Sequence, residues 1–311
     1  VKYYGETKAV DDVSFKVEAG EVLGFLGPNG AGKSTTMNIL TGFISATAGT
    51  VKINGYDILE EPEKARKCIG YLPEQPPLYK DMTVLEYLTF VCDLKGVAKK
   101  DQMTHLANIM ALVKITDVRK RLIRNLSKGY KQRVGIAQAL VGDPEVIVLD
   151  EPTVGLDPKQ IKEIRQTIRS LGKKHTVILS SHILSEVAAT CDRVVIINNG
   201  KLVASGAANS LGEAVDGISR VEVIIQSEND RTMQILRSVP GITKVSFLRR
   251  EKGSLAYEYE TSENVDVRAE VFKTFAKESM PIIGMRSLNP TLEDIFLKVT
   301  SSSYKFGERE E

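Results

Sequence analysis

The part of this sequence that most limits its fold is the glycine-rich segment 27–35, which reads GPNGAGKST. It follows the apolar run 22–26, which predicts a buried strand, and precedes 36–40, which predicts a helix ended by Gly42. Glycines let such a turn curl with its N–H groups facing inward, and the N-terminus of the helix adds positive potential. The segment predicts a phosphate-binding turn in an α/β fold. The flanking strand and helix argue against an ordinary glycine-rich turn.

The side chains of this turn have the types that bind a nucleotide with its metal ion. In a turn ending Gly-Lys-Ser, Lys33 would reach the terminal phosphates and the Ser34 hydroxyl would hold Mg²⁺. The expected nucleotide-binding residues are Asn29, Gly30, Ala31, Gly32, Lys33, Ser34 and Thr35. The turn alone indicates an NTPase and does not identify the process that it drives.

Length and charge narrow the class of protein. The chain has 311 residues, which favours two domains, and 42% of them are hydrophobic, enough for sizeable cores. The 42 Lys and Arg residues nearly balance the 40 Asp and Glu residues, so no overall basic field indicates nucleic acid as a partner.

Cysteine usage and hydropathy indicate the compartment. Cys68, Cys92 and Cys191 form no C-x-x-C pair, so we expect buried thiols in a reducing compartment. No apolar run approaches the ~18 residues that span a bilayer, and no signal peptide precedes the first strand, so we expect a cytoplasmic protein. The chain begins with Val1, which indicates a trimmed start. If the protein works at a membrane, another chain must cross it.

Residues 1–208 have the pattern of one α/β domain. Continuous apolar, β-branched runs predict strands covered on both faces of a parallel sheet at 146–149, 177–179 and 194–197. Shorter strands are expected at 51–53, 69–71 and 201–203. Val13, Phe15 and Val17 alternate with polar residues, which predicts a half-buried strand.

A helical segment interrupts this pattern from Thr83 to about Leu140. Thr83 and Glu86 have the spacing of a capping box, and Ser127 is placed to cap a later helix. Asp157 before a proline predicts the start of another helix. With the proline-rich loop before it, the segment is expected to form a helical subdomain over about 76–140.

A second domain is expected after a linker of small residues at 209–217. The predicted order is strand, helix, strand, strand, helix, strand, at 221–225, 231–239, 244–248, 255–259, 267–277 and 282–286. This order is typical of a ferredoxin-like α+β domain, expected over 218–300. A closing helix at 292–299 ends it, and a polar tail follows at 301–311.

Two carboxylates follow one of the buried strands. Asp150 and Glu151 come directly after the run 146–149. A carboxylate at the end of a parallel strand beside a phosphate-binding turn is where Mg²⁺ and its waters are held. Glu151, one residue further on, is placed to polarise an attacking water. Two acidic residues at a strand end are common by themselves, but here they belong to the same α/β pattern as the turn.

Further motifs amount to a family resemblance. Residues 126–130 read LSKGY, 155–157 read GLD, and 180–182 read SSH. Together with the turn, the two carboxylates and the aromatic Tyr4, they resemble the ATP-binding cassette of ABC transporters. The resemblance covers about residues 3–205, and its motifs occur in the family's order. It implies a P-loop NTPase cassette with a mixed sheet and a helical subdomain.

The resemblance implies a role for each matching residue. The catalytic residues would be Glu151 as general base, His182 as the clamp on the γ-phosphate and water, and Lys33. Magnesium would be held by Ser34, by Asp150 and by either Gln75 or Glu74. Tyr4 would stack on adenine. In the family two cassettes face each other head to tail, so that Ser127 and Gly129 complete the partner's site and Asp157 contacts the partner.

Two of these residues also fit purely structural roles, and two motifs depart from the family. Tyr4 is otherwise a terminal aromatic residue, and His182 is otherwise the start of a helix; His105 and His175 match no motif and are expected at the surface. The signature has Lys128 and Tyr130 where the family has Gly and Gln. The position after Tyr71-Leu72-Pro73 holds Glu74 instead of Gln, with Gln75 next, so which of the two reaches the metal stays open.

The expected function is that of an ATP-binding and ATP-hydrolysing subunit of an ABC exporter. The variant signature and the extra C-terminal domain, which would serve dimer contact or regulation, are similar to those of bacterial drug-resistance and gliding-type exporters. The partners would be a separate membrane permease, received by the helical segment 83–125, and a second cassette, either a copy or a relative. The protein would lie on the inner face of the cell membrane. Nothing in the sequence indicates the cargo.

Other functions fit less well. An ABC importer ATPase is disfavoured by the C-terminal domain and the signature, and a soluble ABC ATPase on ribosomes or DNA by the single cassette without a heptad run. An RNA-recognition fold is suggested by Tyr257 and Tyr259. It lacks stacking aromatics, because Ser254 and Ala256 occupy those positions.

Overall fold

The structure is a computed structural model, and it describes residues 1–208, 218–227, 231–251, 253–262, 265–288 and 296. These residues form two compact units: the described part of one ends at Ala208, and the described part of the other begins at Ile218. The expected linker at 209–217 and the polar tail lie outside the described residues, as does the closing helix at 292–299 apart from Phe296.

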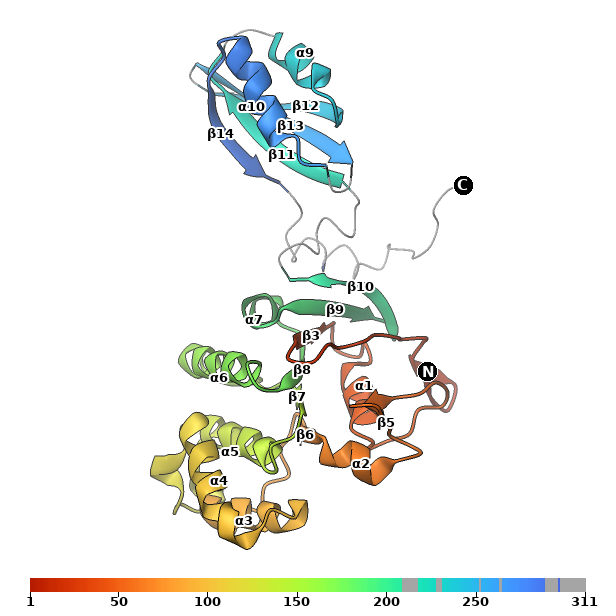
Figure 1. The fold of residues 1–311 in the computed structure, drawn as a ribbon, viewed down its shortest axis with the longest axis vertical. Helices are drawn as coiled ribbons and strands as arrows, with labels where there is room; N and C mark the ends of the chain where they lie inside the picture. Colours follow the sequence, from red (N-terminus) through yellow and green to blue (C-terminus); the bar gives the residue numbers. More distant parts are fainter. Residues whose placement is uncertain (209–217, 228–230, 252, 263–264, 289–295, 297–311) are drawn as a thin grey trace. The chain divides into compact units, whose positions relative to one another are not determined.

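A six-stranded sheet forms the centre of the described part of the first unit (Figure 1). Its strands are β3 (Val22–Leu26), β6 (Ile69–Leu72), β7 (Val146–Asp150), β8 (Thr176–Ser181), β9 (Arg193–Asn198) and β10 (Lys201–Ala207). They lie in the order β10-β9-β3-β8-β7-β6; β10 is antiparallel to β9 and the other neighbours are parallel. The loops that follow β3, β8, β7 and β6 therefore emerge side by side at one edge.

Helices cover both faces of this sheet, which explains why its strands are apolar along nearly their whole length. Figure 1 shows α1 and α2 on one side and α5, α6 and α7 on the other. Their bounds are α1 (Lys33–Leu40), α2 (Pro62–Lys67), α5 (Lys128–Leu140), α6 (Pro158–Leu171) and α7 (Leu184–Thr190). The expected mixed α/β cassette is the fold of this unit.

The strand expected over Val13–Val17 is wrong as a strand but right as a packing pattern. Val13, Phe15 and Val17 are half-buried against the core around Phe25, while the residues between them are exposed, and the segment belongs to no sheet. An alternating pattern predicts which side chains are buried. It does not predict whether the backbone pairs with another strand.

The short strand expected at 51–53 is confirmed as β4 (Lys52–Ile53), but several other short elements had no sequence signal. Strand β1 (Lys2–Tyr4) pairs with β2 (Thr7–Val10), and β4 pairs with β5 (Tyr56–Asp57). Helix α2 precedes β6 where only a strand was expected. These elements are two to six residues long. That is too short for hydrophobic periodicity to reveal them.

The expected helical segment consists of three α-helices with 3₁₀ turns between them. These are α3 (Val84–Lys95), α4 (Lys99–Leu112), η1 (Thr116–Val118), η2 (Ile123–Asn125) and α5. The predicted capping box is confirmed: the Thr83 hydroxyl accepts from the Glu86 N–H at 3.2 Å, and the Glu86 carboxylate accepts from the Thr83 N–H at 2.8 Å. Gly96 ends α3 with a φ of 72°, which favours glycine.

The second unit has one antiparallel sheet of four strands in the order β12-β13-β11-β14 within its described residues. Along the chain its elements are β11 (Ile218–Ile225), α9 (Arg231–Ser238), β12 (Ile242–Glu251), β13 (Ser254–Ser262), α10 (Arg268–Lys277) and β14 (Ile282–Ser287). Tyr257 and Tyr259 are buried in its core with Leu236 of α9 and Phe275 of α10. Neither ring is exposed to stack on a nucleic-acid base.

Two predictions from composition can be compared with the structure. Cys68, Cys92 and Cys191 are all free and buried, which confirms their prediction as core residues. Among the helices described, none combines the length and the hydropathy that a membrane-spanning helix needs.

Candidate functional site

The glycine-rich turn joins the end of β3 to the start of α1, as predicted. Gly30 and Gly32 have φ values of 79° and 102°, in the region that L side chains rarely adopt. A Cβ atom on Gly27 would lie 2.4 Å from the carbonyl oxygen of Ile197, so only glycine fits there. No side chain caps the N-terminus of α1, and its first turn has no acidic residue. The turn thus offers an anion the N–H groups and the positive end of a helix.

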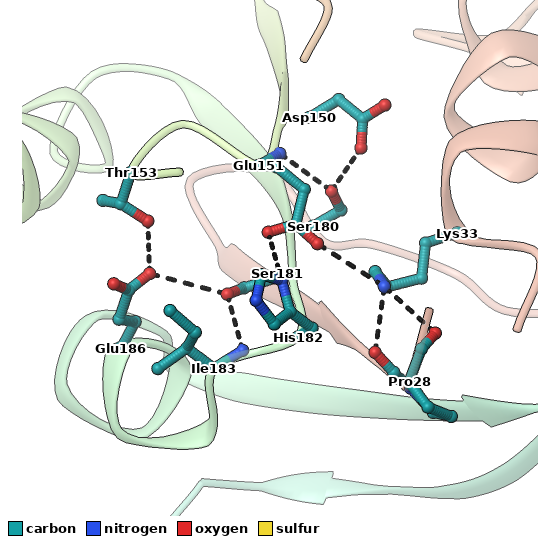
Figure 2. A network of polar contacts seen from close by, with 11 residues as sticks. Pro28, Lys33, Asp150, Glu151, Thr153, Ser180, Ser181, His182, Ile183 and Glu186 are labelled. Carbon is teal, nitrogen blue, oxygen red and sulfur yellow. Dashed lines mark hydrogen bonds and ion pairs between the residues drawn. The ribbon is translucent and has the colours of Figure 1, made fainter. Parts of the chain in front are cut away.

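Lys33, the first residue of α1, turns back over the loop (Figure 2). Its Nζ atom donates to the carbonyl oxygens of Gly27 at 2.9 Å and Pro28 at 3.2 Å. It also lies 3.4 Å from Oε1 of Glu151, and the two side chains are 6% and 7% exposed. The ammonium and the carboxylate are therefore a buried ion pair between the phosphate-binding turn and the end of β7.

Glu151 is also joined to the residue that follows β8. Nδ1 of the half-buried His182 lies 2.9 Å from Oε2 of Glu151. The Glu151 N–H donates to the Ser180 hydroxyl at 3.0 Å, and the backbone of Glu151 has a φ of 48°, which is strained for a residue with a side chain. Lys33 begins α1, whereas Glu151 and His182 follow β7 and β8, and the structure brings the three side chains together.

Asp150 is the last residue of β7 and is almost fully buried. Burial raises the pKa of its carboxyl group, although the hydrogen bond from the Ser180 hydroxyl and the influence of the Ser34 hydroxyl favour the ionised form. The Ser34 hydroxyl acts on the pKa of Asp150 and therefore lies near its carboxyl group, and hard oxygen donors of this kind suit Mg²⁺. No cluster of three or more His, Cys, Asp or Glu side chains with metal-binding geometry occurs in the described residues.

Ser127, Gly129 and Asp157 form a second set at the N-termini of α5 and α6. Ser127 caps α5, its hydroxyl accepting from the Tyr130 N–H at 3.4 Å, and Asp157 caps α6 through the Gln160 N–H at 2.9 Å. Both caps confirm the predicted helix starts. Gly129 is buried, and a Cβ there would lie 2.5 Å from Oε1 of Gln160, so the set packs tightly.

Most of the remaining predicted residues are exposed or half-buried. Tyr4 ends β1 and is 50% exposed, with the Lys2 ammonium 5.3 Å from the centre of its ring. Glu74 and Gln75 are both exposed in the loop after β6. Gln75 lines a cavity of about 770 Å³. Of the turn residues, Asn29 is exposed, Thr35 is half-buried and Ala31 is buried.

The buried polar residues near Asp150, Glu151 and His182 were not predicted from the sequence. Ser180 links Asp150 to Glu151, and Glu186 of α7 accepts a hydrogen bond from the Thr153 hydroxyl. The only signal was the position of these residues near the carboxyl ends of buried strands. His175, expected at the surface, is buried, and its Nδ1 lies 2.8 Å from the carbonyl oxygen of Pro144.

Comparisons with known proteins identify the family. A family model described as ABC transporter matches residues 10–154. The linearmycin resistance ATP-binding protein LnrL of Bacillus subtilis is 30% identical over 98% of this chain and 97% of its own. The bacitracin transport ATP-binding protein BcrA of Bacillus licheniformis is 42% identical over 65% of this chain and 66% of its own.

Solved structures similar to this chain belong to the same family. One is a dimeric, post-hydrolysis state of the ATP-binding cassette MJ0796 bound to ADP and Pi. It has a TM-score of 0.61 and 26% identity over 66% of this chain and 94% of that one. An ATP-binding subunit of an ABC transporter has the same TM-score and 32% identity over 66% of this chain and 86% of that one. The chain therefore belongs to the ABC transporter family, as an ATP-binding ATPase subunit.

Proposed function

We propose that this chain powers an exporter by hydrolysing ATP between two cassettes, through residues of the site described above. The observation that carries the proposal is the meeting of Lys33, Glu151 and His182 at the N-terminus of α1. A phosphate-binding turn, a carboxylate and an imidazole within contact of one another are the groups that phosphoryl transfer to water requires.

Each of the three groups has a chemical task. Glu151 accepts a proton from a water whose oxygen attacks the γ-phosphorus. The bond from that phosphorus to the β,γ-bridging oxygen breaks, and the products are ADP and phosphate. Lys33 neutralises the charge on the terminal phosphates, and His182 holds the γ-phosphate and the water in position.

Magnesium fits the oxygen donors beside this group. Ser34 and Asp150 would hold it, with Gln75 or Glu74 from the loop after β6 as a further donor. The ion would neutralise charge on the β- and γ-phosphates. Since the pKa of Asp150 is raised by burial, a nearby cation also offsets the cost of ionising that carboxyl group.

A second cassette would complete each site. Ser127 and Gly129 lie at the N-terminus of α5, where free N–H groups and the helix dipole suit the γ-phosphate of a nucleotide bound to the partner. Asp157 would contact that partner, and Tyr4 would stack on adenine. The second cassette is a copy of this chain or a related one. Loss of the γ-phosphate would then let the halves separate.

The permease would bind at the helical segment 83–125 with the proline-rich loop before it, within a helical subdomain over about residues 76–140. The cavity that Gln75 lines also includes the apolar side chains of Phe43, Pro73, Pro77 and Val91 and the cations Arg66 and Lys95. Its lining contains no carboxylate among the described residues. A cytoplasmic segment of the permease with apolar and acidic side chains fits such a cavity. The chain would thus lie on the inner face of the membrane.

The second unit would be a ferredoxin-like domain over 218–300 that serves dimer contact or regulation. Its βαββαβ order and its sheet order β12-β13-β11-β14 support this assignment. The cassette would occupy 1–208, with the linker at 209–217 and the tail at 301–311.

The test is purification of the tagged chain from gently solubilised native membranes, with the bound proteins identified by mass. We expect a polytopic membrane protein in stoichiometric amount. The variant Arg66→Glu should lose it and keep ATPase activity, whereas Lys67→Glu, an exposed change one residue along α2, should keep both. Ribosomal or DNA-associated proteins in place of a membrane partner would contradict the exporter.

A further inference from the structure

A buried carboxylate joins the two loops that carry Glu151 and His182. Glu186, in the first turn of α7, is 5% exposed. Its Oε2 atom accepts hydrogen bonds from the hydroxyls of Thr153 and, at 3.5 Å, Ser181 (Figure 2). Both hydroxyl residues are buried as well. One oxygen atom therefore connects the loop after β7 to the end of β8.

Each donor is close in sequence to a residue of the site. Thr153 lies two residues after Glu151, in a turn closed by the Val154 N–H to the carbonyl oxygen of Glu151 at 3.2 Å. Ser181 precedes His182, and its hydroxyl accepts from the Ile183 N–H at 3.0 Å, which ties down the backbone on the far side of His182. Glu186 thus makes no hydrogen bond to the base or the histidine in the described structure but holds the segments that carry them.

The backbone at Glu151 is a reason why such a contact is needed. A residue with a side chain at a φ of 48° is strained, and strained residues persist only where their surroundings hold them. Without the bond from Thr153 to Glu186, the turn after Glu151 can relax. The 2.9 Å separation between Oε2 of Glu151 and Nδ1 of His182 would then no longer be maintained.

We propose that Glu186 is a positioning residue: through Thr153 and Ser181 it sets the geometry between Glu151 and His182 and so determines the rate of ATP hydrolysis. The inference rests on the proposed roles of Glu151 and His182. It predicts that losing the hydrogen bond lowers kcat without weakening ATP binding, because Lys33 and the glycine-rich turn belong to a different loop. Small displacements of a catalytic group cost on the order of tenfold to a hundredfold in rate.

The test compares hydroxyl replacements in the full-length chain. Thr153→Val removes the donor with little change of shape, and Thr153→Ser keeps it. Thr190→Val is the matched control. It makes the same replacement in α7, where the buried Thr190 hydroxyl has no hydrogen-bond partner in the described structure. We expect Thr153→Val to lower kcat by about tenfold or more with the KM for ATP unchanged, and Thr153→Ser and Thr190→Val to keep the wild-type kcat.

Two further variants test the proposal, one of them independently of whether Thr153→Val folds. If Thr153→Val does not fold, Glu186→Met, which removes the acceptor oxygens at similar side-chain length, replaces it and should show the same loss of kcat at constant KM. In a Glu151→Gln background, Thr153→Val should add little further loss, because both act on one step. A Thr153→Val enzyme as active as Thr190→Val would overturn the role of Glu186 while leaving the ATPase intact. A wild-type chain with no ATPase activity, or an undiminished Glu151→Gln variant, would instead overturn the proposed site.

Discussion

Nζ of Lys33 lies 3.4 Å from Oε1 of Glu151, and both side chains are buried. This pair links the group that would bind the phosphates to the group that would activate water. The other carboxylate oxygen of Glu151 faces His182 at 2.9 Å. Removing either charge leaves the other buried without its partner, so replacements at these positions change both the chemistry and the local electrostatics.

Replacing Glu151 with glutamine should stop turnover and keep ATP binding. The amide has nearly the same shape but cannot accept the proton of the attacking water. We expect kcat to fall by about 10²–10³-fold, the usual cost of losing one such group. Steady-state hydrolysis and nucleotide binding should be measured beside Glu145→Gln, an exposed change just before β7. Hydrolysis at the wild-type rate would disprove the assignment of the base.

Replacing Lys33 with alanine should remove nucleotide binding itself. A ligand that binds only the folded state raises stability by about 2.7 kcal/mol at a hundred times its Kd, and this rise requires the phosphate contacts. We expect the increase in melting temperature on adding MgATP to disappear in Lys33→Ala. Lys67→Ala, on the exposed face of α2, should retain it. A full ATP-dependent shift in Lys33→Ala would show that the phosphates bind elsewhere.

Replacing Asp150 with asparagine should stabilise the nucleotide-free protein at neutral pH while abolishing Mg²⁺-dependent hydrolysis. Burial raises the pKa of this carboxyl in the folded state. Between its unfolded and folded pKa values, the folded protein binds more protons than the unfolded one. The free energy of unfolding therefore falls as pH rises through that window and stays lower above it.

Thermal unfolding without nucleotide or Mg²⁺ at several pH values measures this effect. The melting temperature of Asp150→Asn should exceed that of the wild type at neutral pH, and the difference should shrink as the pH is lowered. Asp12→Asn, an exposed change, should follow the wild type throughout. A less stable Asp150→Asn at every pH would contradict the prediction.

A carboxylate in the second unit should give stability a pH dependence opposite to that of Asp150. Glu222 of β11 is almost fully buried between Arg249 and Arg286. Burial alone would raise the pKa of Glu222, but hydrogen bonds from the two guanidinium groups outweigh it and lower the pKa. Stability from this group is therefore present above the ordinary Glu pKa and is lost as pH falls through the lowered folded value.

Glu222→Gln should weaken the sheet of the second unit by about 1.5–3 kcal/mol, the usual contribution of a hydrogen bond to a charged group. Hydrogen exchange of β11 and β14 in the full chain measures this locally. The exposed partner of Arg249, Glu251, offers a control in Glu251→Gln, which should change exchange little. Equal protection in Glu222→Gln and the wild type would show that the buried carboxylate is not important for stability.

Much of the fold and of the site could be predicted because the signals are local. The glycine-rich turn, the caps at Thr83, Ser127 and Asp157, and the buried strands are each encoded within a few residues. Local patterns also led to errors. Val13–Val17 has the alternation of a strand but no partner, and His175 is buried although it matches no motif.

The sequence by itself determined the chemical groups of this protein: a phosphate-binding turn, two carboxylates at a strand end and a histidine after another strand. Only the tertiary structure decided which of them touch. Lys33, Glu151 and His182 meet because β3, β8 and β7 are neighbours in the sheet and end at one edge. The bonds from Thr153 and Ser181 to Glu186 depend on the same strand order. Contacts between distant segments depend on which strands pair, and local periodicity does not predict that pairing.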